Sequence, residues 1–330
     1  MTAAPAGAPV LEIRDLQAQL HTRWGVVRAV DGVSLLVHEG ETLGLVGESG
    51  SGKTMTALSV LRLLPEPAGR IVGGQILLDG VDLVPKSERE MEQVRGRQVS
   101  MILQDPQTSL NPVFNVGNQI LEALRTHRRG TDRQSLWTRA AQLLERVRVP
   151  APAERLRAFP HQISGGTKQR VVGAIAISCE PRLLIADEPT TALDATIQLQ
   201  YLRLLKEIQG RTRLAMLFIT HDFGIVARMC DRVAVMYAGR IVESGPIRSI
   251  FRRPSHPYTA ALLASVPRME ARTERLPSIE GQPPSLHAMP PGCRFVARCR
   301  YAEGRCHEEY PPAIPVGPAH EASCWRAEPA

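Results

Sequence analysis

Apolar and polar positions alternate in short runs through the first part of the chain. LEIRDLQAQL and VRAVDGVSLLVHEGETLGLVG are broken by Asp-Gly and Glu-Gly pairs, and IVGGQILLDGVDL has the same form. Such runs are typical of β-strands joined by tight turns. VSMILQD has the composition of a further strand that ends in polar residues. We therefore expect the N-terminal part of the chain to be rich in strands.

The apolar positions take helical spacing between about residues 113 and 160. ILEALRTHRRG and LWTRAAQLLERVRV place them among many arginines, which predicts a helical insertion. RLLIADEP and LAMLFITHD are nearly continuous apolar runs, typical of strands buried on both faces of a parallel sheet. RVAVMYAGRIVESG predicts a hairpin that turns at Ala238 and Gly239.

Periodicity is lost after Pro254. Prolines and arginines dominate through about residue 290, which predicts a connector. We therefore expect a main domain at 1–253, with a helical subdomain at about 113–180. The connector would occupy 254–290 and a cysteine-containing region 291–330.

The charge of the chain favours anionic partners. The sequence carries a formal charge of +7 and a pI near 9.4, although a generally basic surface would give the same values. No apolar run approaches the roughly 18 residues that cross a bilayer, and MTAAPAGAPV lacks the regions of a secretory signal. We therefore expect a cytosolic chain that reaches a membrane only through a partner.

The clearest motif is GESGSGKT, between an apolar strand and the helical run MTALSVLRLL. It fits the pattern G-x-x-x-x-G-K-[ST], whose backbone N–H groups converge on phosphate oxygens at a helix N-terminus. The lysine would reach the β- and γ-phosphates, and the threonine would offer its hydroxyl to Mg²⁺. The motif consists of Gly47, Glu48, Ser49, Gly50, Ser51, Gly52, Lys53 and Thr54. We call residues 47–54 the phosphate loop.

A second acidic motif follows the strand in RLLIADEP. Asp187 stands at its carboxyl end, where a carboxylate can hold Mg²⁺ through water. Glu188 comes next, placed to orient or deprotonate an attacking water. An acidic pair that only ends a strand is the alternative, but the complete phosphate loop upstream favours the catalytic interpretation.

With these motifs in order, residues 11–265 resemble the nucleotide-binding subunit of an ABC transporter. MILQDPQTSLNPVF, FPHQISGGTKQR, LLIADEPTTALD, ITHD and HPYTAALLASVP resemble the oligopeptide/dipeptide permease subfamily. The resemblance implies an α/β fold, the ABC-type P-loop ATPase with a RecA-like core, an antiparallel β subdomain and a helical subdomain. It also implies a small cysteine-containing C-terminal extension.

The resemblance assigns further site residues. ISGGTKQ is similar to the family's LSGGQ signature, which presents Ser164, Gly165 and Gly166 to the γ-phosphate on a partner subunit, while Thr167 departs from the usual glutamine. The resemblance also implies that Gln104 senses Mg²⁺ and the attacking water, and that His221 is the switch histidine that contacts the γ-phosphate. Asp194 would belong to the loop that couples the two sites, and Trp24 would be the aromatic that stacks on adenine. For Trp24, an exposed tryptophan at the edge of the core is the alternative.

Four cysteines gather in the C-terminal region. Thiolates of this kind hold an iron–sulfur cluster or zinc, yet no C-x-x-C pair is present. The subfamily's extension has this arrangement and implies a [4Fe-4S] cluster, with zinc as the alternative. The cysteines are Cys293, Cys299, Cys306 and Cys324.

The resemblance predicts an ATPase that binds ATP and Mg²⁺ and powers peptide import at the cytoplasmic face of a bacterial membrane. Expected partners are a second, related ABC ATPase subunit, two transmembrane permease subunits and an extracytoplasmic peptide-binding protein. The alternative is a soluble ABC ATPase that acts on nucleic acid, ribosomes or iron–sulfur assembly. We expect no nucleic-acid partner, because no aromatic-rich basic stretch is present. Nickel chelates and glutathione-like compounds remain alternative substrates, and redox control through the tail is compatible with transport.

Overall fold

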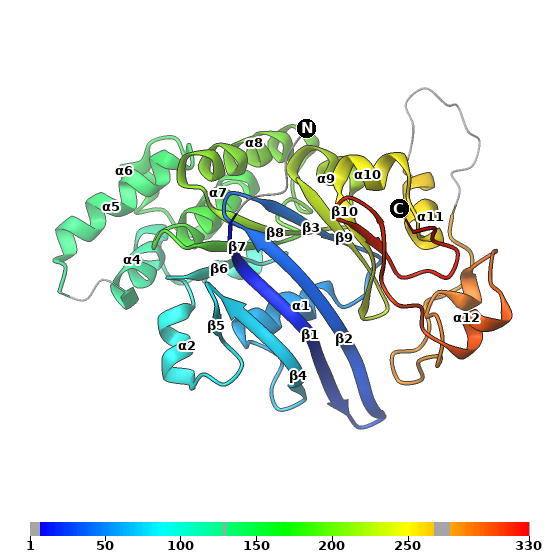
Figure 1. Ribbon diagram of the computed structural model, residues 1–330. Helices are drawn as coiled ribbons and strands as arrows, with labels where there is room; N and C mark the ends of the chain where they lie inside the picture. Colours follow the sequence, from blue (N-terminus) through cyan, green and yellow to red (C-terminus); the bar gives the residue numbers. More distant parts are fainter. Residues whose placement is uncertain (1–6, 128–129, 267–277, 330) are drawn as a thin grey trace. The chain divides into compact units, whose positions relative to one another are not determined.

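The computed structural model describes residues 7–127, 130–266 and 278–329. The chain divides into two compact units, whose helices and strands are labelled in Figure 1. The first unit contains Met1–His38, Thr42–Val84 and Ile219–Ala330, and the second contains Glu39–Glu41 and Pro85–Phe218. The sequence-based domain boundaries stay a prediction.

The first unit contains an antiparallel sheet with the strand order β2-β1-β4-β5. Its strands are β1 (Pro9–Thr22), β2 (Gly25–His38), β4 (Gly69–Leu78) and β5 (Val81–Asp82). The turn predicted at Asp31-Gly32 is wrong, because β2 continues through this pair. Leu16 pairs with Val33 and Gln17 with Asp31, so Gly32 is skipped in the ladder. Its φ of 79° suits a glycine β-bulge.

Five further strands of the first unit follow the order β11-β12-β10-β9-β3. They are β3 (Thr42–Val46), β9 (Arg232–Tyr237), β10 (Arg240–Pro246), β11 (Ile314–Gly317) and β12 (His320–Ala322). β3 is parallel to β9, whereas β9 and β10 form an antiparallel hairpin. The predicted turn at Ala238 and Gly239 is confirmed.

The helices of the first unit are mostly short. They are α1 (Lys53–Leu61), α9 (Phe223–Met229), α10 (Ile247–Arg252), α11 (Pro257–Ala264), η2 (Val296–Arg298) and α12 (Gly304–Glu308). The segment predicted as a connector thus contains α11. Residues 267–277 of the same segment lie outside the described residues.

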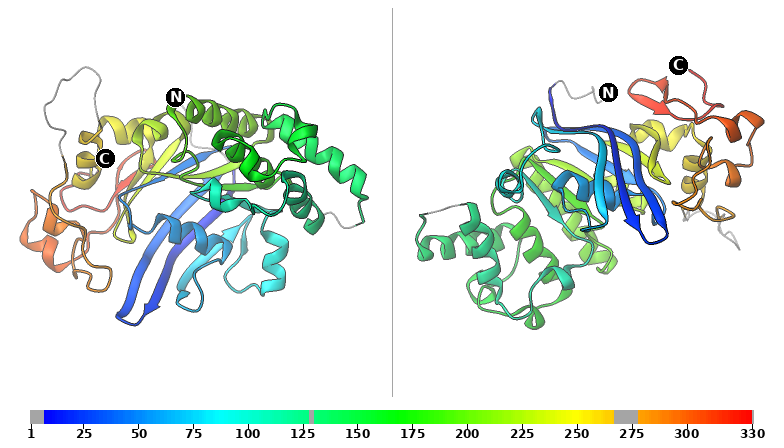
Figure 2. Two further views of the ribbon diagram at one scale, coloured as in Figure 1. Left: turned by 180° about the vertical axis from the view of Figure 1, so that it is seen from behind. Right: turned by 90° about the horizontal axis from the view of Figure 1, so that it is seen from below.

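The described C-terminal residues pack on the rest of the first unit. The Phe295 ring centroid lies 5.3 Å from that of Tyr237 and 5.4 Å from that of Tyr258, and all three side chains are buried. β12 pairs with β10, and His320 Nε2 lies 2.8 Å from Glu243 Oε1. In both views of Figure 2, the orange-to-red C-terminal segment lies against the yellow region of α11.

The second unit contains the strand order β8-β7-β6 and most of the longer helices. Its strands are β6 (Val99–Ile102), β7 (Leu183–Asp187) and β8 (Ala215–Thr220), of which the last two residues belong to the first unit. Its helices are α2 (Glu88–Val94), α3 (Pro106–Ser109), α4 (Val116–His127), α5 (Arg133–Arg146), α6 (Pro152–Arg155), η1 (Pro160–Gln162), α7 (Gly165–Ala176) and α8 (Ala195–Thr212). Every residue of β7 and β8 is buried, which confirms the interpretation of their apolar runs.

Candidate nucleotide site

The phosphate loop connects β3 to α1, as its flanking sequences predict. Gly52 caps α1 with a φ of 109°, and a side chain there would collide with the carbonyl oxygen of Ala29. At Gly50, no heavy atom apart from those of Gly50 and its two chain neighbours lies within 4 Å of the position that a Cβ would take. The loop therefore packs tightly where it enters the helix and is open at its tip, as a cradle for phosphate groups requires.

Lys53 is folded against the phosphate loop. Its Nζ donates to the carbonyl oxygens of Gly47 and Glu48 at 2.8 and 2.9 Å, and it lies 3.5 Å from Ser51 Oγ. The side chain is buried, whereas Thr54 at the start of α1 is exposed. An ammonium group is thus held beside the backbone that would surround the phosphates.

Glu48 binds residues that sequence reasoning missed. Its backbone N–H donates to Tyr258 Oη at 2.9 Å, and its carboxylate pairs with Arg298 through two hydrogen bonds of 2.7 and 3.0 Å. Tyr258 lies 210 residues away in sequence and Arg298 lies 250 residues away. The resemblance of HPYTAALLASVP to the subfamily was the only signal near Tyr258, and nothing singled out Arg298.

Glu188 and Gln104 meet beside the ends of β7 and β6. The two strands are parallel, and Ile102 pairs with Ala186, so residues just past these positions reach the same edge. Gln104 Nε2 donates to Glu188 Oε2 at 3.1 Å, and Thr191 Oγ1 lies 3.1 Å from the same oxygen.

The backbone at Glu188 takes a left-handed conformation, with a φ of 46°. This region is uncommon for a residue other than glycine and is enriched at functional sites. Asp187, directly before it, is buried at the end of β7. The acidic pair therefore combines one buried carboxylate with a second one held by polar side chains.

The predicted signature residues share a cavity of about 520 Å³ with Asp194. Ser164 caps α7, and its Oγ accepts from the Thr167 N–H at 3.3 Å and lies 2.9 Å from Thr167 Oγ1. Asp194 caps α8 by accepting from the N–H groups of Thr196 and Ile197. Gly165 and Gly166 line the same cavity. Thr167, the departure from the usual glutamine, thus takes part in the cap of α7.

His221 and Trp24 lie in the first unit with the phosphate loop. His221 directly follows β8 and is exposed. Trp24 lies in the turn between β1 and β2, is 71% exposed, and has the Arg23 guanidinium 3.9 Å from its ring centroid. The structure therefore leaves the Trp24 ring available for stacking on one face.

The four predicted cysteine ligands line one cavity, together with His256 and Phe295. The pKa of Cys293 is raised to about 11, mainly by burial, with a smaller contribution from the other three cysteines. Among the residues that the structure describes, however, no three His, Cys, Asp or Glu side chains stand close enough to hold a metal ion. The structure therefore does not support the predicted [4Fe-4S] cluster, although it brings the four thiols to one place.

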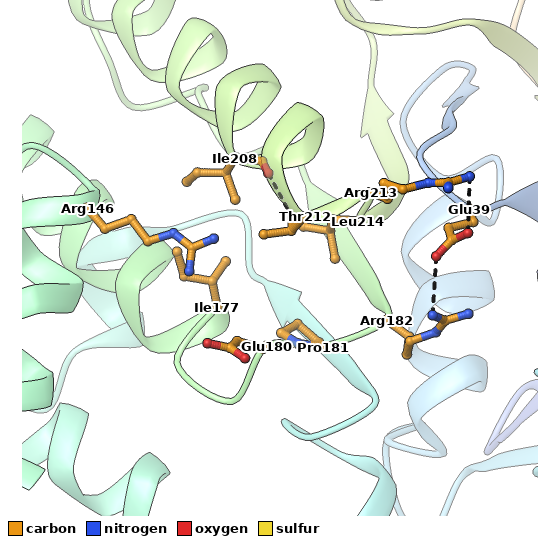
Figure 3. Close-up of a pocket in the computed structure, with 10 residues that line it drawn as sticks. All are labelled: Glu39, Arg146, Ile177, Glu180, Pro181, Arg182, Ile208, Thr212, Arg213 and Leu214. Carbon is orange, nitrogen blue, oxygen red and sulfur yellow. Dashed lines mark hydrogen bonds and ion pairs between the residues drawn. The ribbon is translucent and has the colours of Figure 1, made fainter.

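A separate pocket in the second unit has a volume of about 440 Å³ (Figure 3). Arg182 and Arg213 line it and pair with the same carboxylate, that of Glu39, each at 3.3 Å. Arg182 and Leu214 directly precede β7 and β8, so the pocket lies at the amino ends of these strands. It contains none of the predicted site residues and is distinct from the end of β7 that carries Asp187.

Comparison with known families gives two matches along the chain. Residues 30–191 match the family model described as ABC transporter. Residues 242–306 match the model described as oligopeptide/dipeptide transporter, C-terminal region. The second match includes Tyr258, Arg298 and three of the four predicted cysteine ligands.

Individual relatives extend over nearly the whole chain. It is 49% identical to the "Probable peptide ABC transporter ATP-binding protein" of Sinorhizobium fredii, over 99% of this chain and 98% of the relative. It is 48% identical to the oligopeptide transport ATP-binding protein OppD of Bacillus subtilis, over 97% of this chain and 89% of the relative.

Among solved structures, a dimeric bacterial ABC transporter cassette superimposes with a TM-score of 0.64 at 23% identity. The superposition covers 72% of this chain and 99% of the cassette. It confirms the predicted α/β fold of the P-loop ATPase type.

Proposed function

Because the chain belongs to the ABC transporter family, we propose that it is the ATP-hydrolysing subunit of a peptide importer. The observation that best supports ATP hydrolysis is the hydrogen bond from Gln104 to Glu188, next to the buried Asp187. The relatives named for peptide transport and the match of residues 242–306 support peptides as cargo. These findings do not favour a soluble ATPase for nucleic acid, ribosomes or cluster assembly, nor nickel or glutathione-like cargo.

ATP would be bound through its phosphates at the phosphate loop. The open space at Gly50 and the N-terminus of α1 suit oxyanions, and Lys53 supplies a positive charge beside them. Trp24 would stack on the adenine. Mg²⁺ neutralises phosphate charge when bound, and Thr54, Gln104 and Asp187 would hold it directly or through water.

Glu188 would orient and deprotonate the attacking water. Its carboxylate is held by Gln104 and Thr191, so the side chain is positioned before the reaction. His221 would contact the γ-phosphate. Ser164, Gly165, Gly166 and Asp194 would complete the site of a second subunit, since they line an open cavity at the N-terminus of α7.

Glu188→Gln tests this assignment, because it removes the base and keeps the size of the side chain. The variant should bind ATP with near wild-type affinity and lose at least about a hundredfold in the rate of phosphate release. Glu180→Gln, at an exposed acid that pairs with Arg139, is the matched control and should hydrolyse ATP normally. Near-normal turnover in Glu188→Gln would remove this residue from catalysis.

The transporter would be completed by other chains. We infer a second ABC ATPase subunit, two permease subunits and an extracytoplasmic peptide-binding protein, with this chain held at the cytoplasmic face by the permeases. Among the described residues, no helix is both long and apolar enough to span a bilayer. Affinity purification from native membranes in mild detergent, followed by mass spectrometry, should recover the permeases and the second ATPase. Recovery with ribosomes alone would contradict the transport function.

The tail cysteines are the remaining candidate metal site. We propose a [4Fe-4S] cluster, with zinc as the alternative, because the four thiols line one cavity and thiolates are suitable donors for either. The thiols would have to move closer together on binding, since among the described residues no three of them stand close enough for a metal ion. Protein purified without oxygen should then absorb near 400 nm, a rough value for thiolate-bound iron–sulfur centres. Colourless protein with stoichiometric zinc would favour the alternative, and metal-free protein would contradict both.

A further inference from the structure

The phosphate loop carries a carboxylate, which is unfavourable for a site that binds an anion. Glu48 is the second residue of the loop, so it adds a negative charge to the segment that the proposed function assigns to the phosphates. The Glu48 carboxylate would repel bound phosphates, and this repulsion increases as water is excluded from the site. A positive partner for Glu48 would remove this penalty.

Arg298 is that partner, and its position is unusually well defined. Its side chain is 4% exposed, and its two terminal nitrogens bind the two carboxylate oxygens of Glu48 at 2.7 and 3.0 Å. A bidentate pair of this geometry is stronger and more specific than a single contact. The hydrogen bonds to Glu48 are also the main reason why the pKa of Arg298 is raised.

The rest of the guanidinium is held by residues of the same unit. Nη1 also contacts Tyr237 Oη at 3.3 Å, while Nη2 and Nε donate to the carbonyl oxygens of Ile279 and Glu280 at 3.2 and 3.0 Å. These contacts and the pair with Glu48 use all five N–H donors of an arginine. Because every N–H donor of Arg298 has an acceptor, the guanidinium is fixed in position beside the phosphate loop.

We infer that Arg298 is a positioning residue of the nucleotide site, which neutralises Glu48 and holds the phosphate loop in its ATP-binding form. The C-terminal region thereby contributes to ATP affinity without touching the nucleotide. Tyr258 acts in the same sense on the backbone, since its hydroxyl accepts the N–H of Glu48. The inference rests on the proposed function, because it concerns the same phosphate loop.

A double-mutant cycle tests the inference in the full-length chain. The dissociation constant of a fluorescent ATP analogue with Mg²⁺ is measured for the wild type, Arg298→Ala, Glu48→Gln and the double variant. Arg298→Ala exposes the Glu48 charge and should weaken binding about tenfold, less at high salt because the effect is electrostatic. Glu48→Gln leaves a positive charge and should bind more tightly. The double variant should recover most of the affinity that Arg298→Ala loses.

The affinity of the double variant distinguishes neutralisation of Glu48 from a role of Arg298 in merely anchoring the C-terminal region. If Arg298 only anchored the C-terminal region, adding Glu48→Gln would not restore binding. Arg253→Ala is the matched control, since Arg253 and Glu328 form an ion pair with side chains 82% and 83% exposed, and it should leave the affinity unchanged.

Two results would overturn the inference. Equal affinity of Arg298→Ala and the wild type, or a double variant as weak as Arg298→Ala, would refute the charge-neutralising role while leaving the ATPase assignment intact. A folded wild-type chain that binds no ATP would instead overturn the proposed function, and the inference with it.

Discussion

At the residue scale, Lys53 provides the direct test of the phosphate loop. The side chain is buried and donates to carbonyl oxygens of the loop, so its charge is already placed where phosphates would bind. Lys53→Ala should weaken ATP binding at least about tenfold, because a charge-assisted contact contributes roughly 1.5–3 kcal/mol. The affinity is measured by titration with a fluorescent ATP analogue.

Lys86→Ala is the control for this variant. Lys86 lies outside every predicted site motif, so its removal should leave the affinity unchanged. Circular dichroism would show that both variants are folded. An unchanged affinity in Lys53→Ala would contradict the assignment of residues 47–54 to phosphate binding.

The residue scale also shows how far the site could be predicted. The types and spacing of Lys53, Asp187 and Glu188 predicted a nucleotide site, because these short motifs carry their own chemistry. The left-handed backbone at Glu188 and its bond to Gln104 could not be read from the sequence. Both depend on the register of β6 and β7, which brings the ends of these strands together.

At the element scale, α11 is capped at its N-terminus by a buried histidine, His256. His256 Nδ1 accepts the backbone N–H of Tyr258 at 3.0 Å, and the backbone N–H of His256 donates to Glu243 Oε2 at 3.0 Å. Burial is the main reason why the pKa of His256 is lowered to about 4, although Glu243 raises it. The helix is therefore capped by a neutral imidazole.

This cap predicts a pH dependence of stability. Below about pH 6.5 the unfolded chain protonates this histidine, while the folded chain resists protonation until about pH 4. The free energy of unfolding should thus decrease as the pH falls from about 6.5 to about 4. Urea unfolding across this range measures the slope.

His256→Asn should flatten the slope, because asparagine caps helices without titrating. His21→Asn, at an exposed histidine of β1, should retain the wild-type slope. Identical slopes for the wild type and His256→Asn would show that His256 is not the group responsible.

At the scale of the whole molecule, the C-terminal residues stabilise the unit that carries the phosphate loop. Phe295 is buried against Tyr237 and Tyr258, in addition to the contact of Arg298 with Glu48. Phe295→Ala should lower the free energy of unfolding by about 3 kcal/mol or more, since it leaves a cavity between these rings. Thermal unfolding should show a correspondingly lower midpoint.

Phe114→Ala is the matched control, because this phenylalanine is 49% exposed. Its loss should change the stability by less than about 1 kcal/mol. If both phenylalanine variants unfolded at the wild-type midpoint, the packing of the C-terminal region would contribute little to stability.

The sequence by itself determined the kind of protein and the identity of its local motifs. Strand runs, helical spacing and the phosphate loop depend on residues that are close together in the chain, so pattern alone reveals them. The sequence also showed that the four tail cysteines are close together in the chain, but it did not show how their side chains are arranged in space.

Only the tertiary structure decided which distant residues support the site. Arg298 and Tyr258 reach Glu48 across 250 and 210 residues, and nothing in their local sequence encodes that meeting. The buried carboxylate of Glu243 likewise contacts both the backbone N–H of His256 and the imidazole of His320. Such contacts form only when the chain has folded, because packing and the hydrogen-bonding needs of buried polar groups select the partners.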